Sequence, residues 1–176
     1  MDRNAKIDEL LAKEEIREAI YRCARGTDRQ DAAMIRSCYH PDGIDDHGLY
    51  KQKGHDFAGL VERSTLGGAH HIIGQIIFVE FKGNVAYTES TVEYHNVAEA
   101  TESMDIRDDF IGARYLDRFE KRGDGPWLIA YRRVVWDWRY YLPASAKKRN
   151  MPATCVWYAK GSKDESYHIG EFPKTV

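Results

Sequence analysis

Two long stretches in the second half of the chain alternate apolar and polar positions with a period of two. They cover residues 110–121 and 127–141, and both are rich in β-branched and aromatic residues. The residues between them include Gly-Asp-Gly-Pro, which has the composition of a turn. The pattern therefore predicts a long β-hairpin.

One face of the second strand of this hairpin carries a charged residue among apolar ones. A period of two places Arg132 on the same face as Val134 and Trp136. A buried charge without a partner costs several kcal/mol. Arg132 therefore either pairs with a carboxylate, as a residue at the rim of the sheet would, or stands over a cavity that receives an anionic group.

Apolar residues at helical spacing predict a long amphipathic helix over residues 5–26. The apolar stripe is formed by Ile7, Leu10, Leu11, Ile16, Ala19, Ile20, Cys23 and Ala24. Gly26 is a typical helix stop, so Asp28 is expected just after the last turn. There it either caps a second helix, at about residues 32–38, or directs its side chain back toward the core.

The middle of the chain is predicted to form one helix and two paired strands. The helix covers residues 54–66, the strands cover 69–81 and 84–94, and a polar loop at 97–108 precedes the hairpin. The first strand is almost continuously apolar, which is typical of a strand covered on both faces. It begins with His70 and His71, and only one of these can face the interior because adjacent strand residues point to opposite faces.

The order of helices and then four long antiparallel strands indicates an α+β fold, in which a curved antiparallel sheet wraps around the N-terminal helices. The length of 176 residues fits a single domain, with a core at about 5–143. The tail at 144–176 loses periodicity and is expected to cover a pocket or an interface. Within it, residues 156–158 form either a short edge strand or a lid.

Surface composition bears on possible partners. The outer face of the sheet is expected to carry Tyr115, Phe119, Tyr131 and Val135, which is more apolar area than a monomer normally exposes. We therefore predict a homodimer or homotrimer. The formal net charge of −2 and the pI near 6.4 argue against nucleic acid or an anionic membrane as a partner.

Two features of the sequence bear on the location of the protein. The sequence has no apolar stretch that resembles a secretion signal or a membrane span. Its three cysteines are odd in number and widely spaced, which suits free thiols in a reducing compartment. A cytoplasmic location is expected.

The segment from His40 to His47 contains two histidines and three aspartates, which are ligand types for a divalent metal. Pro41 and Gly43 in the same segment are turn formers, however, and the candidate ligands do not recur at a same-face spacing. We therefore expect no metal site here.

Four segments together resemble the SnoaL-like branch of the nuclear transport factor 2-like superfamily. They are residues 14–21 followed by Gly-Thr-Asp28, the Tyr50-Lys pair, the run from His71 to Gln75, and the hairpin sequence from Tyr115 to Arg132. The resemblance covers about residues 8–141, and its pattern is most similar to γ-hexachlorocyclohexane dehydrochlorinase and scytalone dehydratase. It implies a cone-shaped α+β barrel with an internal pocket, and lyase chemistry without a cofactor or a metal.

The resemblance also assigns roles to individual residues. Asp28 and His71 match the aspartate and the histidine of the family's Asp/His dyad. Arg132 matches an arginine that binds the leaving group in the dehydrochlorinase. A small hydrophobic or aromatic substrate is expected to contact Tyr21, Tyr50, Gln75 and Trp136. The tail does not match, so substrate identity stays open.

These residue types support a definite chemistry. A neutral imidazole is a suitable base near neutral pH, and a carboxylate on its other nitrogen fixes the tautomer. An arginine across the cavity can hold an anionic leaving group or an enolate. The sequence therefore predicts a lyase or isomerase that abstracts a proton beside a carbonyl, aromatic or halogen-bearing carbon. The alternative is a non-catalytic binding or interaction subunit, like the small subunit of ring-hydroxylating dioxygenases, because this fold hosts many functions.

Overall fold

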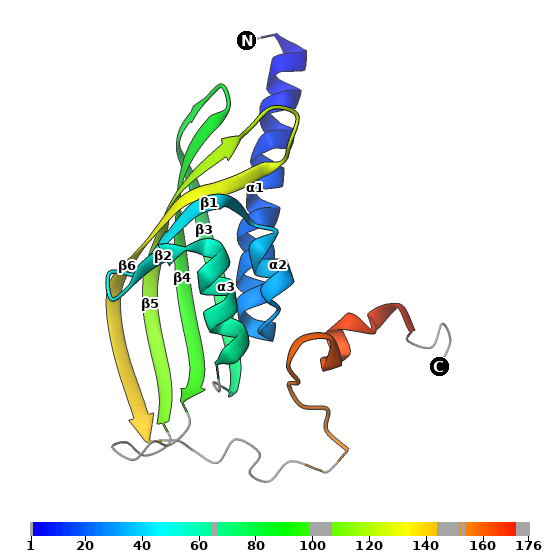
Figure 1. The fold of residues 1–176 in the computed structure, drawn as a ribbon, viewed down its shortest axis with the longest axis vertical. Helices are drawn as coiled ribbons and strands as arrows, with labels where there is room; N and C mark the ends of the chain where they lie inside the picture. The colour runs from blue at the N-terminus through cyan, green and yellow to red at the C-terminus, as the bar shows by residue number, and fades with distance from the viewer. Residues whose placement is uncertain (1, 65–66, 99–106, 144–151, 153, 172–176) are drawn as a thin grey trace.

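The computed structural model of the chain describes residues 2–64, 67–98, 107–143, 152 and 154–171. Within these residues the helices are α1 (Arg3–Arg29), α2 (Ala32–Arg36) and α3 (Gly54–Arg63). The strands are β1 (Tyr39–Asp46), β2 (Lys51–Lys53), β3 (Gly67–Lys82), β4 (Val85–Ala98), β5 (Arg107–Lys121) and β6 (Trp127–Pro143). Short 3-10 turns at Gly161–Lys163, Glu165–Tyr167 and Ile169–Glu171 follow. The helices lie on one face of a curved sheet (Figure 1), which confirms the α+β class.

The described strands form one mixed sheet in the order β2-β1-β6-β5-β4-β3. Strands β3 to β6 are antiparallel neighbours, as predicted, whereas β1 runs parallel to β6. The sequence did not predict β1, because Pro41 and Gly43 indicated a turn. Both lie where the β1–β6 register shifts, in a bulge. A β-carbon on Gly43 would lie 2.5 Å from the backbone oxygen of Ile129, so only glycine lets β1 approach β6 there.

The predicted helix stop at Gly26 is wrong. Helix α1 continues to Arg29, and Gln30 ends it in the left-handed conformation with φ 53°. A β-carbon on Gly26 would lie 2.9 Å from Cγ1 of Ile35 in α2, so this glycine allows two helices to approach closely. Asp28 therefore lies within the last turn of α1, where the helix backbone holds it in place.

The main core lies between α1 and the inner face of the sheet. Ile16 and Ile20 of α1 are fully buried and belong to the same cluster as Phe119 and Ile129 of the sheet. A second apolar cluster consists of Val92, Ile111, Ala113, Tyr115 and Val134. All of its members come from β4, β5 and β6, so the sheet alone supplies this cluster.

The predicted composition of the outer sheet face is partly wrong. Tyr115 and Phe119 are only 8% and 0% exposed, and both pack in the core. Tyr115 pairs across the strands with Val134, and directly paired residues share a face of the sheet. Tyr131 and Val135 alternate with that inner row and lie on the outer face.

Strand β3 is an edge strand, and the prediction that both of its faces are covered is wrong for the single chain. Ile72 is 63% exposed and Val79 is 69% exposed, whereas the face toward α1 is partly buried. The helices cover only one side of the sheet, which leaves these apolar side chains in contact with solvent. None of the helices in the described part of the chain is long and apolar enough to cross a membrane.

Candidate active site

A cavity of about 510 Å³ is lined by the end of α1, by β1 and α3, and by the four long strands. This volume is typical of a site for a small molecule. Most of the lining side chains are apolar or aromatic, among them Phe57, Leu60, Val92, Ile111, Tyr115 and Val134. The second apolar cluster of the fold therefore serves as a cavity wall.

Asp28 and His71 meet at this cavity. Oδ1 of Asp28 lies 2.6 Å from Nδ1 of His71, and Oδ2 accepts a hydrogen bond of 3.0 Å from the backbone N–H of the same residue. The side chains are 13% and 9% exposed, respectively. When the carboxylate is ionised, Nδ1 is the donor, so Nε2 carries the lone pair. Nε2 forms no hydrogen bond with any residue that the structure describes, and it is therefore available to a ligand.

The ring of the dyad histidine packs against a tyrosine of the neighbouring strand. His71 in β3 pairs with Tyr94 in β4, and the two rings lie 4.5 Å apart between centroids. Burial, followed by the nearby charge of Asp28, raises the pKa of the Tyr94 phenol. Burial likewise raises the pKa of Tyr50 and of Tyr115. These three phenols therefore stay protonated at neutral pH and can donate hydrogen bonds into the cavity.

Arg132 lines the cavity but already has a buried anionic partner. Its Nε and Nη2 donate to the two carboxylate oxygens of Asp117 at 2.7 and 2.6 Å, and its Nη1 lies 3.6 Å from Sγ of Cys23. The guanidinium also stands 4.0 Å from the ring centroid of Tyr115. The sequence left two environments open for Arg132, a carboxylate partner at the rim of the sheet or a position over a cavity. The structure shows a carboxylate partner, Asp117, and places it in the buried core. Two of the five N–H groups of Arg132 remain for a ligand.

The other residues expected to contact substrate divide into two groups. Tyr50 and Trp136 line the cavity. Gln75 does not, because the β3–β4 register shifts between Ile73 and Ile76 and leaves Gln75 exposed instead of on the face of His71. Tyr21 also lies outside, 48% exposed, and lines a smaller hollow on the other side of the dyad.

The structure separates the two ends of the segment that was considered as a metal site. Nε2 of His40 lies 3.0 Å from the backbone oxygen of Glu120, whereas Asp45 and His47 line the cavity. In the described part of the chain, no group of three or more His, Cys, Asp or Glu side chains could hold a metal ion. The i, i+2 spacing of Asp45 and His47 fits one face of a strand, but the turn formers before them hid that signal.

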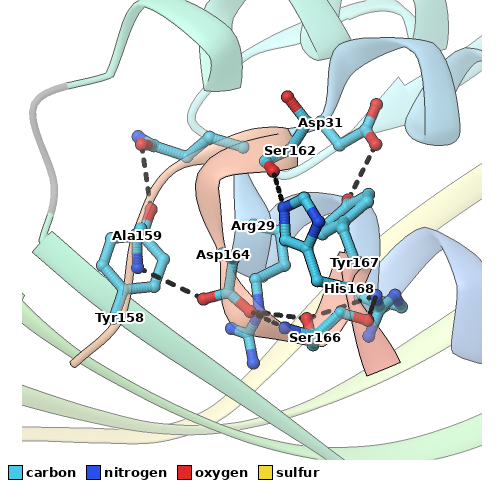
Figure 2. Close-up of polar contacts among 11 residues, drawn as sticks. Arg29, Asp31, Tyr158, Ala159, Ser162, Asp164, Ser166, Tyr167 and His168 are labelled. Atoms are coloured by element: carbon cyan, nitrogen blue, oxygen red, sulfur yellow. Dashed lines mark hydrogen bonds and ion pairs between the residues drawn. The ribbon is translucent and has the colours of Figure 1, made fainter. Parts of the chain in front are cut away.

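The C-terminal segment reaches the cavity through Tyr158, whose hydroxyl donates to Oε1 of Gln30 at 3.1 Å. Residues 156–158 form no strand. Asp164 organises the segment, because it accepts hydrogen bonds from Ser166 and from the backbone of Ala159 and pairs with Arg29 at 3.4 Å (Figure 2). Tyr167 adds a bond of 2.7 Å to Asp31. The segment is thus attached to the end of α1, next to the dyad.

Comparison with known proteins gives one family match and several structural matches. Residues 8–133 match the SnoaL-like domain model, and no curated protein matches the sequence. A type 2 hexachlorocyclohexane dehydrochlorinase has a TM-score of 0.69 and 16% identity, covering 85% of this chain and 99% of that chain. A protein of Novosphingobium aromaticivorans proposed to be a scytalone dehydratase has a TM-score of 0.63 and 16% identity, covering 88% and 99%. For the Kfla4162 protein of Kribbella flavida the values are 0.65 and 14%, covering 75% and 95%. At such identities the structural matches show the fold alone.

Proposed function

This chain belongs to the SnoaL-like domain family, and we propose that it is a cofactor-independent lyase or isomerase acting on a small cyclic or aromatic molecule. The observation that carries the proposal is the 2.6 Å contact between Asp28 and His71 at the wall of an apolar cavity. A carboxylate-oriented imidazole with an unoccupied second nitrogen is a typical general base.

In the proposed reaction, Nε2 of His71 removes a proton from a carbon beside a carbonyl, an aromatic ring or a halogen-bearing carbon. Asp28 keeps the ring in the required tautomer and stabilises the imidazolium that forms. The electron pair left on carbon either expels a leaving group or is reprotonated at another position. The first outcome is an elimination and the second is an isomerisation.

Arg132 and the cavity phenols can stabilise the negative charge that develops. The guanidinium is fixed by Asp117, so its remaining N–H groups are preorganised and need no rearrangement during the reaction. Because Asp117 offsets the charge of Arg132, we expect it to act through directed N–H donors rather than as a free cation. Tyr50 lines the same cavity and can contribute a further hydroxyl donor.

The dehydrochlorinase and the proposed scytalone dehydratase carry out, by their names, two different eliminations. Their low identities leave the substrate of this chain open, and the proposal depends on the dyad geometry instead. We further propose a cytoplasmic homodimer or homotrimer. The free thiols of Cys23, Cys38 and Cys155 support a reducing location, and the exposed apolar residues of β3 support self-association.

A deuterium-exchange experiment tests the proposal against a purely binding role. Cyclic ketones that carry a hydroxyl or a chlorine on the β carbon are incubated with the protein in D₂O, and α-deuteration and product formation are followed by NMR. We expect the wild type to accelerate exchange and His71→Gln to abolish the acceleration. Equal exchange with both proteins and with buffer would instead favour a non-catalytic binding or interaction subunit.

A further inference from the structure

A second aspartate–histidine pair lines the same cavity as the dyad. Oδ1 of Asp45 lies 2.6 Å from Nδ1 of His47, and the side chains are 1% and 16% exposed, respectively. Neither of these two atoms forms a hydrogen bond with another group in the described part of the chain. Nε2 of His47 is likewise without a hydrogen bond among the described residues, so this ring also presents one nitrogen to a ligand.

The second pair is built as firmly as the first. Tyr39 donates to Oδ2 of Asp45 at 2.6 Å, so the carboxylate cannot turn away from the histidine. The backbone N–H of His47 donates to the carbonyl of Tyr50 at 2.9 Å, and Nε1 of Trp136 donates to the carbonyl of His47 at 2.8 Å. The imidazole also stacks on Tyr50 with centroids 4.7 Å apart. These contacts fix both the backbone and the ring.

The two pairs lie toward opposite ends of the strand order, on the same face of the sheet. His71 is in β3 at one edge, whereas His47 directly follows β1, and strands β6, β5 and β4 separate the two. A ligand in the cavity between them would have one imidazole at each end. Such an arrangement suits a reaction that removes a proton at one atom and delivers a proton at another.

The two aspartates differ in burial, because the side chain of Asp45 is 1% exposed and that of Asp28 is 13% exposed. Asp45 is fully buried, and the nearby guanidinium of Arg132 is already bound to both oxygens of Asp117. Among the described residues, no Lys or Arg side chain lies within ion-pair distance of Asp45, and its close neighbour is the imidazole of His47. A buried carboxylate needs a partner, and the imidazole of His47 supplies one. Because the proposed function assigns the base to His71, the second pair remains as the source of a proton on the other side of the cavity.

We propose that His47, oriented by Asp45, is the general acid that protonates an oxygen leaving group, so that the substrate is a β-hydroxy carbonyl compound and the reaction a dehydration. This inference rests on the proposed function of His71 as the base. His71 takes the α proton, the electron pair forms the carbon–carbon double bond, and the carbon–oxygen bond breaks. The departing hydroxyl takes the proton from Nε2 of His47 and leaves as water. Proton exchange with solvent then restores both histidines.

The test compares two probes that differ only in their leaving group, 3-hydroxycyclohexanone and 3-chlorocyclohexanone. Loss of hydroxide needs a proton, whereas chloride leaves without one. We expect His47→Gln to slow water loss by on the order of 10²-fold or more, with α-deuterium exchange and chloride loss unchanged. His47→Phe, which keeps the ring packing against Tyr50 and Phe57, should behave in the same way. His71→Gln should lose all three activities.

His70→Gln serves as the matched control, because His70 is exposed on β3 next to the dyad histidine, and all three activities should be retained. If the wild type catalyses exchange but both His47 variants lose water at the wild-type rate, the inference about His47 fails while the base survives. If His47→Gln also loses exchange or chloride release, His47 supports the fold or the dyad and the acid role is overturned. If the wild type does not accelerate exchange, the proposed function itself fails, and the role of His47 fails with it.

Discussion

The carboxylate of Asp28 binds His71 at two points, the ring nitrogen Nδ1 at 2.6 Å and the backbone nitrogen at 3.0 Å. The first contact sets the tautomer of the imidazole, and the second fixes the end of α1 against β3. A single side chain thereby determines both the chemistry and the position of the histidine.

Asp28 and His71 should behave as one unit in mutagenesis. His71→Gln removes the base and should lower turnover by on the order of 10² to 10⁴, and Asp28→Asn should cost a comparable factor by misorienting the ring. The double variant should be little worse than either single variant. Steady-state kinetics on an active β-hydroxy or β-chloro ketone, with circular dichroism as the fold control, measures this. If the loss of turnover in the double variant equals the product of the two single losses, Asp28 and His71 act independently and the prediction is wrong.

Arg132 should matter for stability as well as for activity. Arg132→Met leaves the buried Asp117 carboxylate without its partner, which should lower the free energy of unfolding by about 3–5 kcal/mol. Arg132→Lys should also lower the free energy of unfolding, because a point charge cannot replace the two-point contact of a guanidinium with Asp117. Urea denaturation provides the measurement. Arg118→Met, which removes a half-exposed ion pair with Glu120, is the control and should cost less than about 1 kcal/mol.

The stability of the β1–β6 contact should depend on pH through Asp46. The hydroxyl of Tyr131, followed by the backbone N–H of Gly48, lowers the pKa of Asp46 below its ordinary value. The folded state therefore favours the ionised carboxylate. Its contribution is fully present above the unfolded pKa, near 4, and is lost as the pH falls through the lowered folded value.

This dependence predicts a specific comparison of melting temperatures. The difference in Tm between wild type and Asp46→Asn should be largest near neutral pH and should shrink as the pH is lowered toward about 3. Asp124→Asn, at an exposed turn position, is the control and should show a small difference at every pH. A difference for Asp46→Asn that grows on acidification would contradict the assignment.

Self-association should occur through the exposed apolar part of the sheet. Ile72 and Val79 are 63% and 69% exposed on the edge strand, and contact with a second chain would remove them from water. We expect sedimentation at micromolar concentration to give a dimer or trimer, and Ile72→Lys with Val79→Lys to shift it toward monomer. Leu49→Lys, at a site that is 81% exposed outside the sheet, should leave the assembly intact. A wild-type monomer would overturn this prediction.

Catalysis and folding should not require a metal ion. His40 and His47 point to different partners, the backbone of Glu120 and the side chain of Asp45. Dialysis against a chelator should therefore leave both the Tm and any ketone elimination unchanged. A stoichiometric divalent metal that survives dialysis and whose removal lowers the Tm would show that these histidines had been interpreted incorrectly.

Local periodicity was sufficient to predict much of the architecture. The long hairpin of β5 and β6, the first helix and the α+β order follow from side-chain alternation and helical spacing, which are properties of neighbouring residues. Alternation also showed that only one of His70 and His71 can face the interior, and the family resemblance selected His71. The pairing of Asp28 with His71 was expected only from the family resemblance, because 43 positions separate them in the sequence.

Tertiary structure decided the features that depend on register and on partners from distant strands. A bulge in β3 placed Gln75 outside the cavity, because a one-residue shift reverses the face of every following side chain. Pairing with β6 made the segment before Asp45 a strand despite its turn formers. Gly26 proved to lie inside a continuous helix, where its missing side chain lets α2 pack closely. Arg132 had two possible environments in the sequence, and only the cross-strand position of Asp117 distinguished them. The second histidine of the cavity emerged for the same reason: contacts between residues distant in sequence depend on how the strands pair.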